Sequence, residues 1–191
     1  MTTFRCETCH ADVPSYEITH FGLIEAGYRD LCSRCYNETM VELGAPEFDH
    51  VSFEPITIAD AAGRQRKFHF LLRHLGDRMS LDAFELAEGE RAGYQFQIVD
   101  AIEVDLFDVM RRLVNRMWRA LATCYLIDDT WGTSIDGMNV GGRIACDLST
   151  SPSLPTVVIN GRDVSWHDFG RMVTTFEGWQ FQLAFKDPSE E

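Results

Sequence analysis

Hydrophobic and polar side chains alternate along much of residues 51–103. The apolar positions that carry this period are Phe53, Ile56, Ile58, Phe68, Phe70, Leu72, Phe84, Leu86, Tyr94, Phe96 and Ile98. A period of two places one set of side chains on one face of a β-strand. Turn residues at 61–64 and 89–93 separate the apolar stretches. The pattern therefore predicts a meander of short antiparallel strands.

Residues 105–126 carry apolar side chains at steps of three and four, the spacing of one face of an α-helix. The members of this face are Leu106, Phe107, Met110, Leu113, Val114, Met117, Trp118, Leu121, Cys124 and Tyr125. Asp105 precedes the first of them and is expected to cap the helix. So broad an apolar face is expected to lie across a sheet.

Charged residues line the other side of this helix. Arg112, Arg116 and Arg119 form a stripe that could bind a phosphate or an acidic partner, although a solvated face is the favoured interpretation. Asp108 is expected to pair with Arg112 one helical turn away.

The remaining pattern mixes loops, short strands and one short helix. The predicted elements are loops at 127–142 and 149–155, strands at 143–148, 156–159 and 179–185, and a helix from Ser165 to near Gly178. Asn160-Gly161 is a strong tight-turn signal. Ser165 and Asp168 have the form of a capping box, with Asp in place of the usual Glu.

These elements together predict an α+β fold, with a largely antiparallel sheet covered on one face by two helices. We expect a cysteine-containing module at residues 1–48, one α+β domain at 51–186 and a frayed tail at 187–191.

Two Cys-x-x-Cys pairs, with twenty-two residues between them, mark the first module. Cys6 and Cys9 form the first pair, and Cys32 and Cys35 form the second. Four thiolates in this spacing suit a tetrahedral, structural Zn²⁺ site. In so short a module, metal binding is expected to supply folding free energy on the order of 10 kcal/mol. A redox pair would explain only one motif, and a rubredoxin-like iron site would more typically carry Pro or Gly near its knuckles.

The surroundings of the two pairs differ. The first precedes a segment with hairpin character, from Val13 to Leu31, whereas the second opens into helix-like residues 36–43. This order resembles the treble-clef zinc fingers. A zinc ribbon, which would end in a hairpin, is the alternative.

Net charge changes the functional picture. The chain carries 30 acidic and 17 basic residues, a net charge of −13. Binding to a phosphate backbone needs a basic surface, so the charge disfavours nucleic acid as a partner. The favoured interpretation of the acidic charge is that it keeps the protein soluble. The alternatives are that it binds a partner with a basic surface or mimics a nucleic acid. The chain shows no apolar run of membrane-spanning length and no signal peptide, so we expect a cytoplasmic protein.

Candidate catalytic groups are few. Cys146 and His167 could form a nucleophile–base pair, but Cys146 lies in sequence that predicts a buried strand. Asp128, Asp129 and Asp136 could hold Mg²⁺ or Ca²⁺, although a solvated acidic loop is favoured.

A second resemblance concerns the end of the chain. It rests on the stretches 142–152, 158–173 and 176–181, which include Asn160-Gly161-Arg162 and Glu177-Gly178-Trp179. They resemble a C-terminal domain of uncharacterised bacterial proteins that follows a Cys-x-x-Cys finger. The resemblance implies a bacterial or phage origin and no particular activity.

The leading hypothesis is a non-enzymatic, zinc-binding interaction or adaptor protein whose partner is another protein. A nucleic-acid-associated regulator and an acidic inhibitor or mimic are the alternatives. A hydrolase that uses the 127–150 loop is the least favoured.

Overall fold

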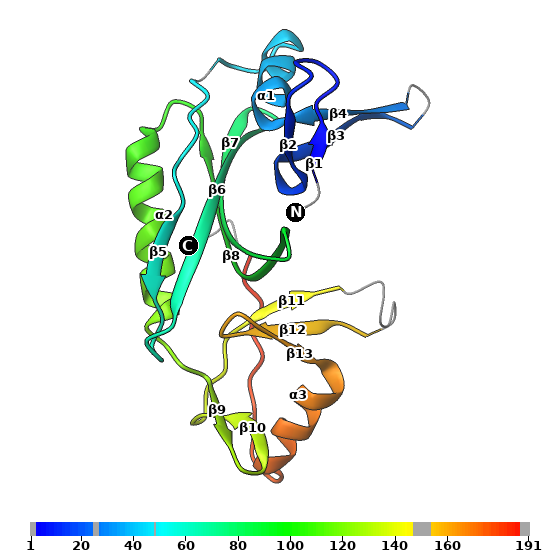
Figure 1. The fold of residues 1–191 in the computed structure, drawn as a ribbon. Coiled ribbons are helices and arrows are strands. Elements are labelled where there is room, and N and C mark those ends of the chain that lie inside the picture. The colour runs from blue at the N-terminus through cyan, green and yellow to red at the C-terminus, as the bar shows by residue number, and fades with distance from the viewer. Residues whose placement is uncertain (1–2, 25–26, 48, 147–153, 188–191) are drawn as a thin grey trace.

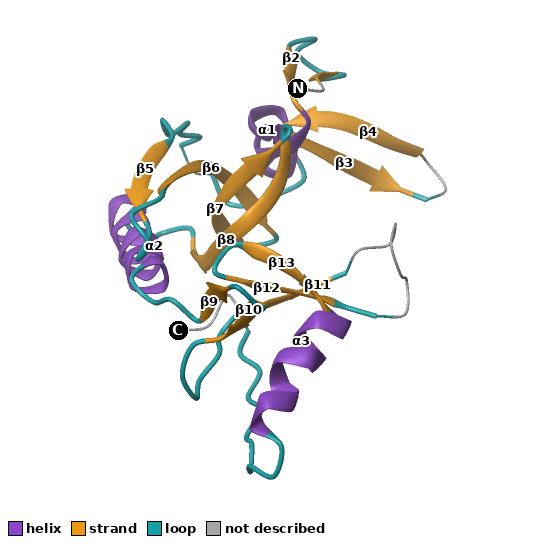
Figure 2. Ribbon diagram, turned by 60° about the horizontal axis from the view of Figure 1, so that its bottom comes forward, coloured by secondary structure: helices purple, strands orange, loops and turns teal. Residues whose placement is uncertain are grey.

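The computed structural model describes residues 3–24, 27–47, 49–146 and 154–187. Within these residues, three α-helices combine with five sheets, and every strand pair is antiparallel (Figures 1 and 2). The predicted α+β class is confirmed. None of the described helices is long and apolar enough to cross a membrane.

The N-terminal module consists of two hairpins and a helix. Its elements are β1 (Thr3–Arg5), β2 (Asp12–Pro14), the 3-10 turn η1 (Ser15–Glu17), β3 (Ile18–Leu23), β4 (Gly27–Cys32) and α1 (Ser33–Glu42). β1 pairs with β2 and β3 pairs with β4. Its small core contains Leu31 and three cysteines, with Val13, Phe21 and Tyr36 packed against them.

The central sheet is the predicted meander. β5 (Ile56–Ala59), β6 (Gln65–Leu75), β7 (Arg78–Ala87) and β8 (Glu90–Ala101) lie side by side in chain order. A bulge between Phe84 and Glu85 shifts the register of β7 against β8. The strands are longer than the sequence predicts, because their charged residues pair across the sheet instead of ending it.

Helix α2 (Leu106–Leu121) lies across one face of this sheet. The backbone N–H of Phe107 donates to Asp105 Oδ1 at 2.9 Å, so the predicted cap is confirmed. Val109, Leu113 and Met117 are fully buried against the strands. The helix ends before Cys124 and Tyr125, which the sequence places on its apolar face. That part of the prediction is wrong, because the chain turns there to enter β9 (Leu126–Asp129).

The last part of the chain forms a second packed unit. After β9 come β10 (Gly132–Ile135), β11 (Arg143–Ala145), β12 (Thr156–Ile159), β13 (Arg162–Ser165), α3 (Trp166–Val173) and the 3-10 turn η2 (Thr174–Phe176). β9 and β10 form a hairpin inside the predicted 127–142 loop, and β12 and β13 turn at Asn160-Gly161 as predicted. The N–H of Asp168 donates to Ser165 Oγ at 3.0 Å, which confirms Ser165 as the N-cap, and the Ser165 hydroxyl donates to Asp168 Oδ2 at 2.7 Å.

Helices α2 and α3 therefore cover different sheets. α2 packs on β5–β8, whereas Phe169 and Met172 of α3 pack on β12 and β13 in a separate buried cluster. Each amphipathic helix buries its apolar face against the strands closest to it in sequence. The stretch predicted as one domain, 51–186, thus contains two packed units.

The strand predicted at 179–185 does not form. These residues follow η2 as an extended segment that pairs with no strand in the described part of the chain, and every one of them is exposed. The residues predicted to end a strand at 147–148, and those of the tail after Asp187, lie outside the described ranges.

The packing of α2 gives a first prediction. Replacing the fully buried Leu113 with alanine is expected to destabilise the protein by about 2–5 kcal/mol, because it removes buried carbon and leaves a cavity under the sheet. Phe107→Ala on the same helix is the matched control, since Phe107 is 81% exposed. Urea denaturation of both variants measures the difference. Equal stabilities would contradict the packing described here.

Candidate metal centre

Four cysteines meet where the two hairpins of the N-terminal module join α1. Cys6 and Cys9 lie on the turn between β1 and β2, Cys32 ends β4 and Cys35 lies in the first turn of α1. Their sulfur atoms all lie within 4.8 Å of one another. Cys6, Cys32 and Cys35 are buried, and Cys9 is exposed. No other group of three or more such ligands forms among the described residues.

The spacing fits a tetrahedral metal shell. Metal–sulfur bonds of about 2.3 Å in a tetrahedron place neighbouring sulfurs about 3.8 Å apart. Cys9 Sγ and Cys32 Sγ lie 3.8 Å apart. The four cysteines could therefore bind one metal ion without rearrangement of the backbone.

Backbone hydrogen bonds hold the first knuckle in place. The N–H of Cys6 donates to the carbonyl of Ala11 at 2.9 Å, and the N–H of His10, at a φ of 59°, donates to the carbonyl of Cys6 at 3.0 Å. The N–H of Cys32 donates to Cys6 Sγ at 3.3 Å, which joins the two pairs. These bonds orient the sulfur atoms toward one another in the folded module.

The thiols respond differently to this environment. Burial raises the pKa of Cys6, but backbone hydrogen bonds from Cys32, Cys9 and Thr8 outweigh it and lower that pKa to about 6. Burial is the main cause that raises the pKa of Cys32 and Cys35. A bound cation would favour the thiolate at all four positions, since metal ligation requires deprotonated sulfur.

Helix α1 ties the cysteine cluster to the central sheet. Asn37, which is buried, donates to the carbonyl of Leu72 at 3.0 Å and accepts from the N–H of His74 at 2.9 Å. The Tyr16 ring also packs against Phe84 of β7, with 5.5 Å between centroids. The module is thus held on the sheet at two places, η1 and α1.

The arginine stripe proposed as a binding surface is engaged inside the protein. Arg112 forms an ion pair with Asp100 of β8, and Arg116 donates to the carbonyl of Gln97 at 3.3 Å. Arg119 donates to the carbonyl of Asn115 at 3.4 Å. The expected pair between Asp108 and Arg112 is wrong. Arg112 reaches the neighbouring strand, and Asp108 pairs with Arg111 at 3.0 Å instead.

Asp128, Asp129 and Asp136 form no three-ligand cluster in the described part of the chain. Cys146 is exposed at the end of β11, so the expectation of a buried strand position is wrong. Asp128 accepts hydrogen bonds from Thr133 at 2.7 Å and from Arg162, and these bonds lower the pKa of its carboxyl. Asp128 is therefore occupied by protein partners.

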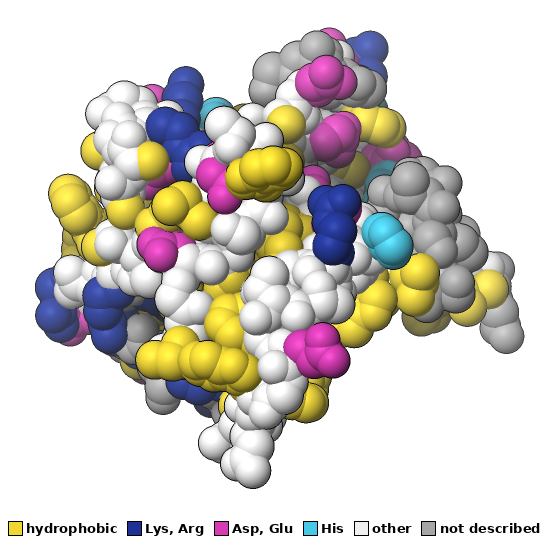
Figure 3. Space-filling view, turned by 90° about the horizontal axis from the view of Figure 1, so that it is seen from below, with side chains coloured by type: hydrophobic (Ala, Val, Ile, Leu, Met, Phe, Trp, Pro, Cys, Tyr) yellow, Lys and Arg dark blue, Asp and Glu magenta, His cyan; other side chains and the backbone are white. Residues whose placement is uncertain are grey.

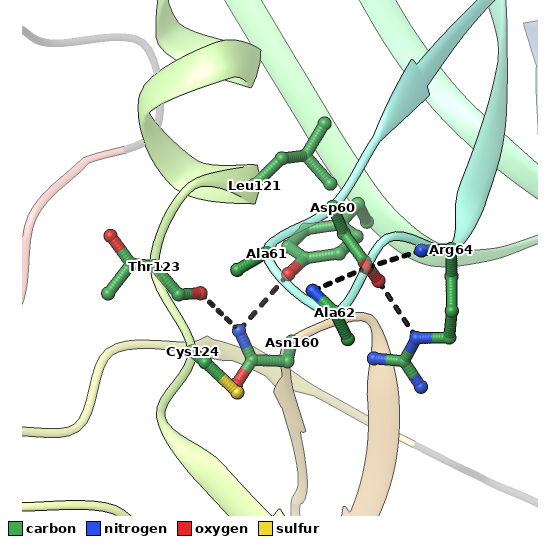
Figure 4. A pocket seen from close by; sticks show the side chains of 9 residues that line it. Asp60, Ala61, Ala62, Arg64, Leu121, Thr123, Cys124 and Asn160 are labelled. Carbon is green, nitrogen blue, oxygen red and sulfur yellow. Dashed lines mark hydrogen bonds and ion pairs between the residues drawn. The ribbon is translucent and has the colours of Figure 1, made fainter.

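Sequence reasoning missed a buried polar junction between the two α+β units. A small pocket of about 10 Å³ lies there, lined by Asp60, Ala61, Ala62, Arg64, Tyr94, Leu121, Thr123, Cys124 and Asn160 (Figure 4). Asn160 Oδ1 accepts from the N–H of Tyr125 at 2.7 Å, and its Nδ2 donates to the carbonyl of Thr123 at 2.7 Å. The Asn-Gly turn signal located Asn160 but not the partners of its side chain. The polar groups satisfy one another, so the junction is structural.

Fold and site together define an α+β protein with an N-terminal four-cysteine cluster that could hold a metal ion. Three family models match successive stretches of it. Residues 5–43 match Domain of unknown function (DUF7685), residues 49–122 match Domain of unknown function (DUF7686) and residues 125–190 match Domain of unknown function (DUF7713).

These matches follow the packed units of the structure. The first ends with α1, the second ends just after α2, and the third begins just before β9. The expected resemblance of the C-terminal part to a domain of unknown function is confirmed. No curated protein and no solved structure matches the chain.

Proposed function

We propose that this chain is a non-enzymatic, zinc-stabilised interaction protein of bacterial or phage origin that binds another protein in the cytoplasm. The four-cysteine shell supports zinc, because an all-thiolate tetrahedral site is typical of structural Zn²⁺. The order of elements supports a treble-clef finger over a ribbon. A knuckle is followed by the β3–β4 hairpin, and the second cysteine pair opens α1.

One observation carries the interaction proposal: the β3–β4 hairpin extends away from the rest of the protein (Figures 1 and 2), and exposed apolar side chains lie along its outer part. Leu23 is 72% exposed, Ile24 is 88% exposed and Tyr28 is 59% exposed. The base of the hairpin pairs Ile18 with Cys32, which belongs to the cysteine cluster. Metal binding would therefore hold this arm at a fixed angle, and a fixed apolar arm suits a groove on a partner protein.

The charges support a protein partner over nucleic acid. Within the α2 stripe, the charge of Arg112 is balanced by Asp100, while Arg116 and Arg119 donate to backbone carbonyls. The net charge of −13 opposes a phosphate backbone. An acidic mimic would bind a basic partner through charge, in a salt-dependent manner, and not through the hairpin end.

The hairpin end supplies the test. The intact chain is used to capture partners from its native host, and each captured protein is then purified and its dissociation constant measured directly. We expect the double variant Leu23→Asp/Ile24→Asp to bind the true partner about tenfold or more weakly, because charge at a buried apolar contact must be desolvated.

The control is Trp131→Asp, which places an added carboxylate at a side chain that is 96% exposed on another hairpin. Metal content of all variants is measured in parallel, so that loss of the finger is not mistaken for loss of contact. A purified partner that binds the double variant and the wild type equally would contradict the role of the hairpin. A captured nucleic acid would contradict the class of function.

A further inference from the structure

The extended segment after η2 carries four large apolar side chains at alternate positions. Trp179 is 63% exposed, Phe181 90%, Leu183 67% and Phe185 73%. In Figure 1 this segment (red) runs from the end of α3 back toward the level of β11. Seen from below, the same end of the molecule shows broad areas of hydrophobic side chains (Figure 3). Few soluble proteins leave such a row in water without a partner for it.

The backbone of this segment is also open. No backbone hydrogen bond joins residues 180–186 to another part of the described chain. The segment has the period of a half-buried strand, with Gln180, Gln182 and Ala184 between the large residues. An unpaired extended backbone with that pattern is a template for a further strand.

We propose that residues 179–185 pair with the same residues of a second copy of this chain, antiparallel and two-fold symmetric about Gln182. In a two-fold symmetric interface, the same surface patch of each copy contacts its counterpart on the other copy. In this register Trp179 faces Phe185 of the second copy, and Phe181 faces its Leu183. Every large apolar residue then meets another one across the strands, where aromatic pairs stabilise a sheet. A shift by one residue would place apolar residues opposite glutamines or Ala184.

The area fits a weak dimer. Aromatic side chains bury about 150–250 Å² each when fully covered. Strand pairing covers the flanks of these four residues on each copy and leaves the outer face of the ribbon exposed, so the buried area falls below about 1,200 Å², in the class of weak interfaces. A dissociation constant on the order of tens of micromolar or weaker is therefore expected.

Charge is consistent with self-pairing at this place. The run from Gly178 to Phe185 has no charged residue, although charged residues make up 25% of the chain. Two chains of net charge −13 repel each other elsewhere. Dimerisation should therefore strengthen as salt rises, because salt screens the repulsion and leaves the uncharged contact intact.

The mass in solution tests the proposal. Sedimentation equilibrium of the full chain between about 1 and 200 µM should show a shift from 21.8 kDa toward twice that mass. Phe181→Asp should weaken association about tenfold or more. Leu23→Asp, at an exposed leucine of the finger, is the control and should leave association unchanged. A wild-type monomer over the whole range, or equal effects of both variants, would overturn the proposal.

Cross-linking tests the register. In a Cys124→Ser/Cys146→Ser background, Gln182→Cys should form a disulfide dimer in air, since facing residues have Cα atoms about 4.5–5.5 Å apart. Gln180→Cys is the matched control, because its two copies would lie about 13 Å apart along the strands. Equal cross-linking at both positions, or none at 182, would overturn the two-fold register.

This inference goes beyond the proposed function and does not depend on it. Partner binding through Leu23 and Ile24 is expected to survive Phe181→Asp, so failure of one proposal leaves the other intact.

Discussion

Replacing Cys32 with alanine is expected to abolish metal binding and to unfold residues 3–42 while the central sheet stays folded. The buried core of the N-terminal module consists of Leu31 and three of the four cysteines. Without a metal ion, that core is too small to offset the loss of chain entropy. Metal binding in modules of this kind supplies on the order of 10 kcal/mol. The cluster around Leu113 lies under α2, apart from the cysteines, and should keep β5–β8 intact.

Two measurements check this result. Elemental analysis should find about one zinc ion per wild-type chain and almost none in the variant. Hydrogen exchange should show loss of protection in β1–β4 and α1 only. Cys146→Ala is the control, because it removes an exposed cysteine far along the chain. If the variant keeps its zinc, or if an apo module keeps its protection, the metal-centre proposal is wrong.

Asn160→Ala is expected to destabilise the junction between the two α+β units by about 3–5 kcal/mol. The side chain is buried and makes four hydrogen bonds: from the N–H groups of Tyr125 and Leu126, and to Tyr94 Oη and the carbonyl of Thr123. Its removal leaves three backbone groups without these partners: the buried N–H of Leu126, and the part-buried N–H of Tyr125 and carbonyl of Thr123. Each such group costs about 1–3 kcal/mol. Asn160 also has a φ of 50°, which alanine adopts less readily than asparagine.

A second substitution separates the two causes. Asn160→Gly removes the same hydrogen bonds but accepts the positive φ without strain. If the lost hydrogen bonds are the main cause, Asn160→Gly should be destabilised nearly as much as Asn160→Ala, as measured by thermal and urea unfolding. Asn115→Ala, at an exposed asparagine of α2, is the matched control. Near-wild-type stability of the glycine variant would show that the hydrogen bonds at this junction contribute little.

Local patterns explain which predictions held. The Asp105 cap, the Ser165–Asp168 box and the turn at Asn160-Gly161 each depend on residues a few positions apart. The meander β5–β8 follows from a period of two and short connections. The predictions that failed concern partners distant in sequence. Arg112 pairs with Asp100 across to β8, and the last residues of the apolar face leave α2 because Asn160 binds the N–H groups of Tyr125 and Leu126.

The sequence by itself predicted the grouping of Cys6, Cys9, Cys32 and Cys35, because the sulfurs within each pair converge through local backbone geometry and one tetrahedral ion takes two such pairs. The α+β class also followed from the sequence, because the hydrophobic periods of strands and of helices can each be recognised within a short stretch of residues. Only the tertiary structure decided that α2 and α3 cover separate sheets, that the arginine stripe is engaged, and that residues 179–185 stay unpaired. Which surface a side chain contacts depends on the packing of segments far apart in the chain. The local hydrophobic periodicity of the sequence carries no information about that packing.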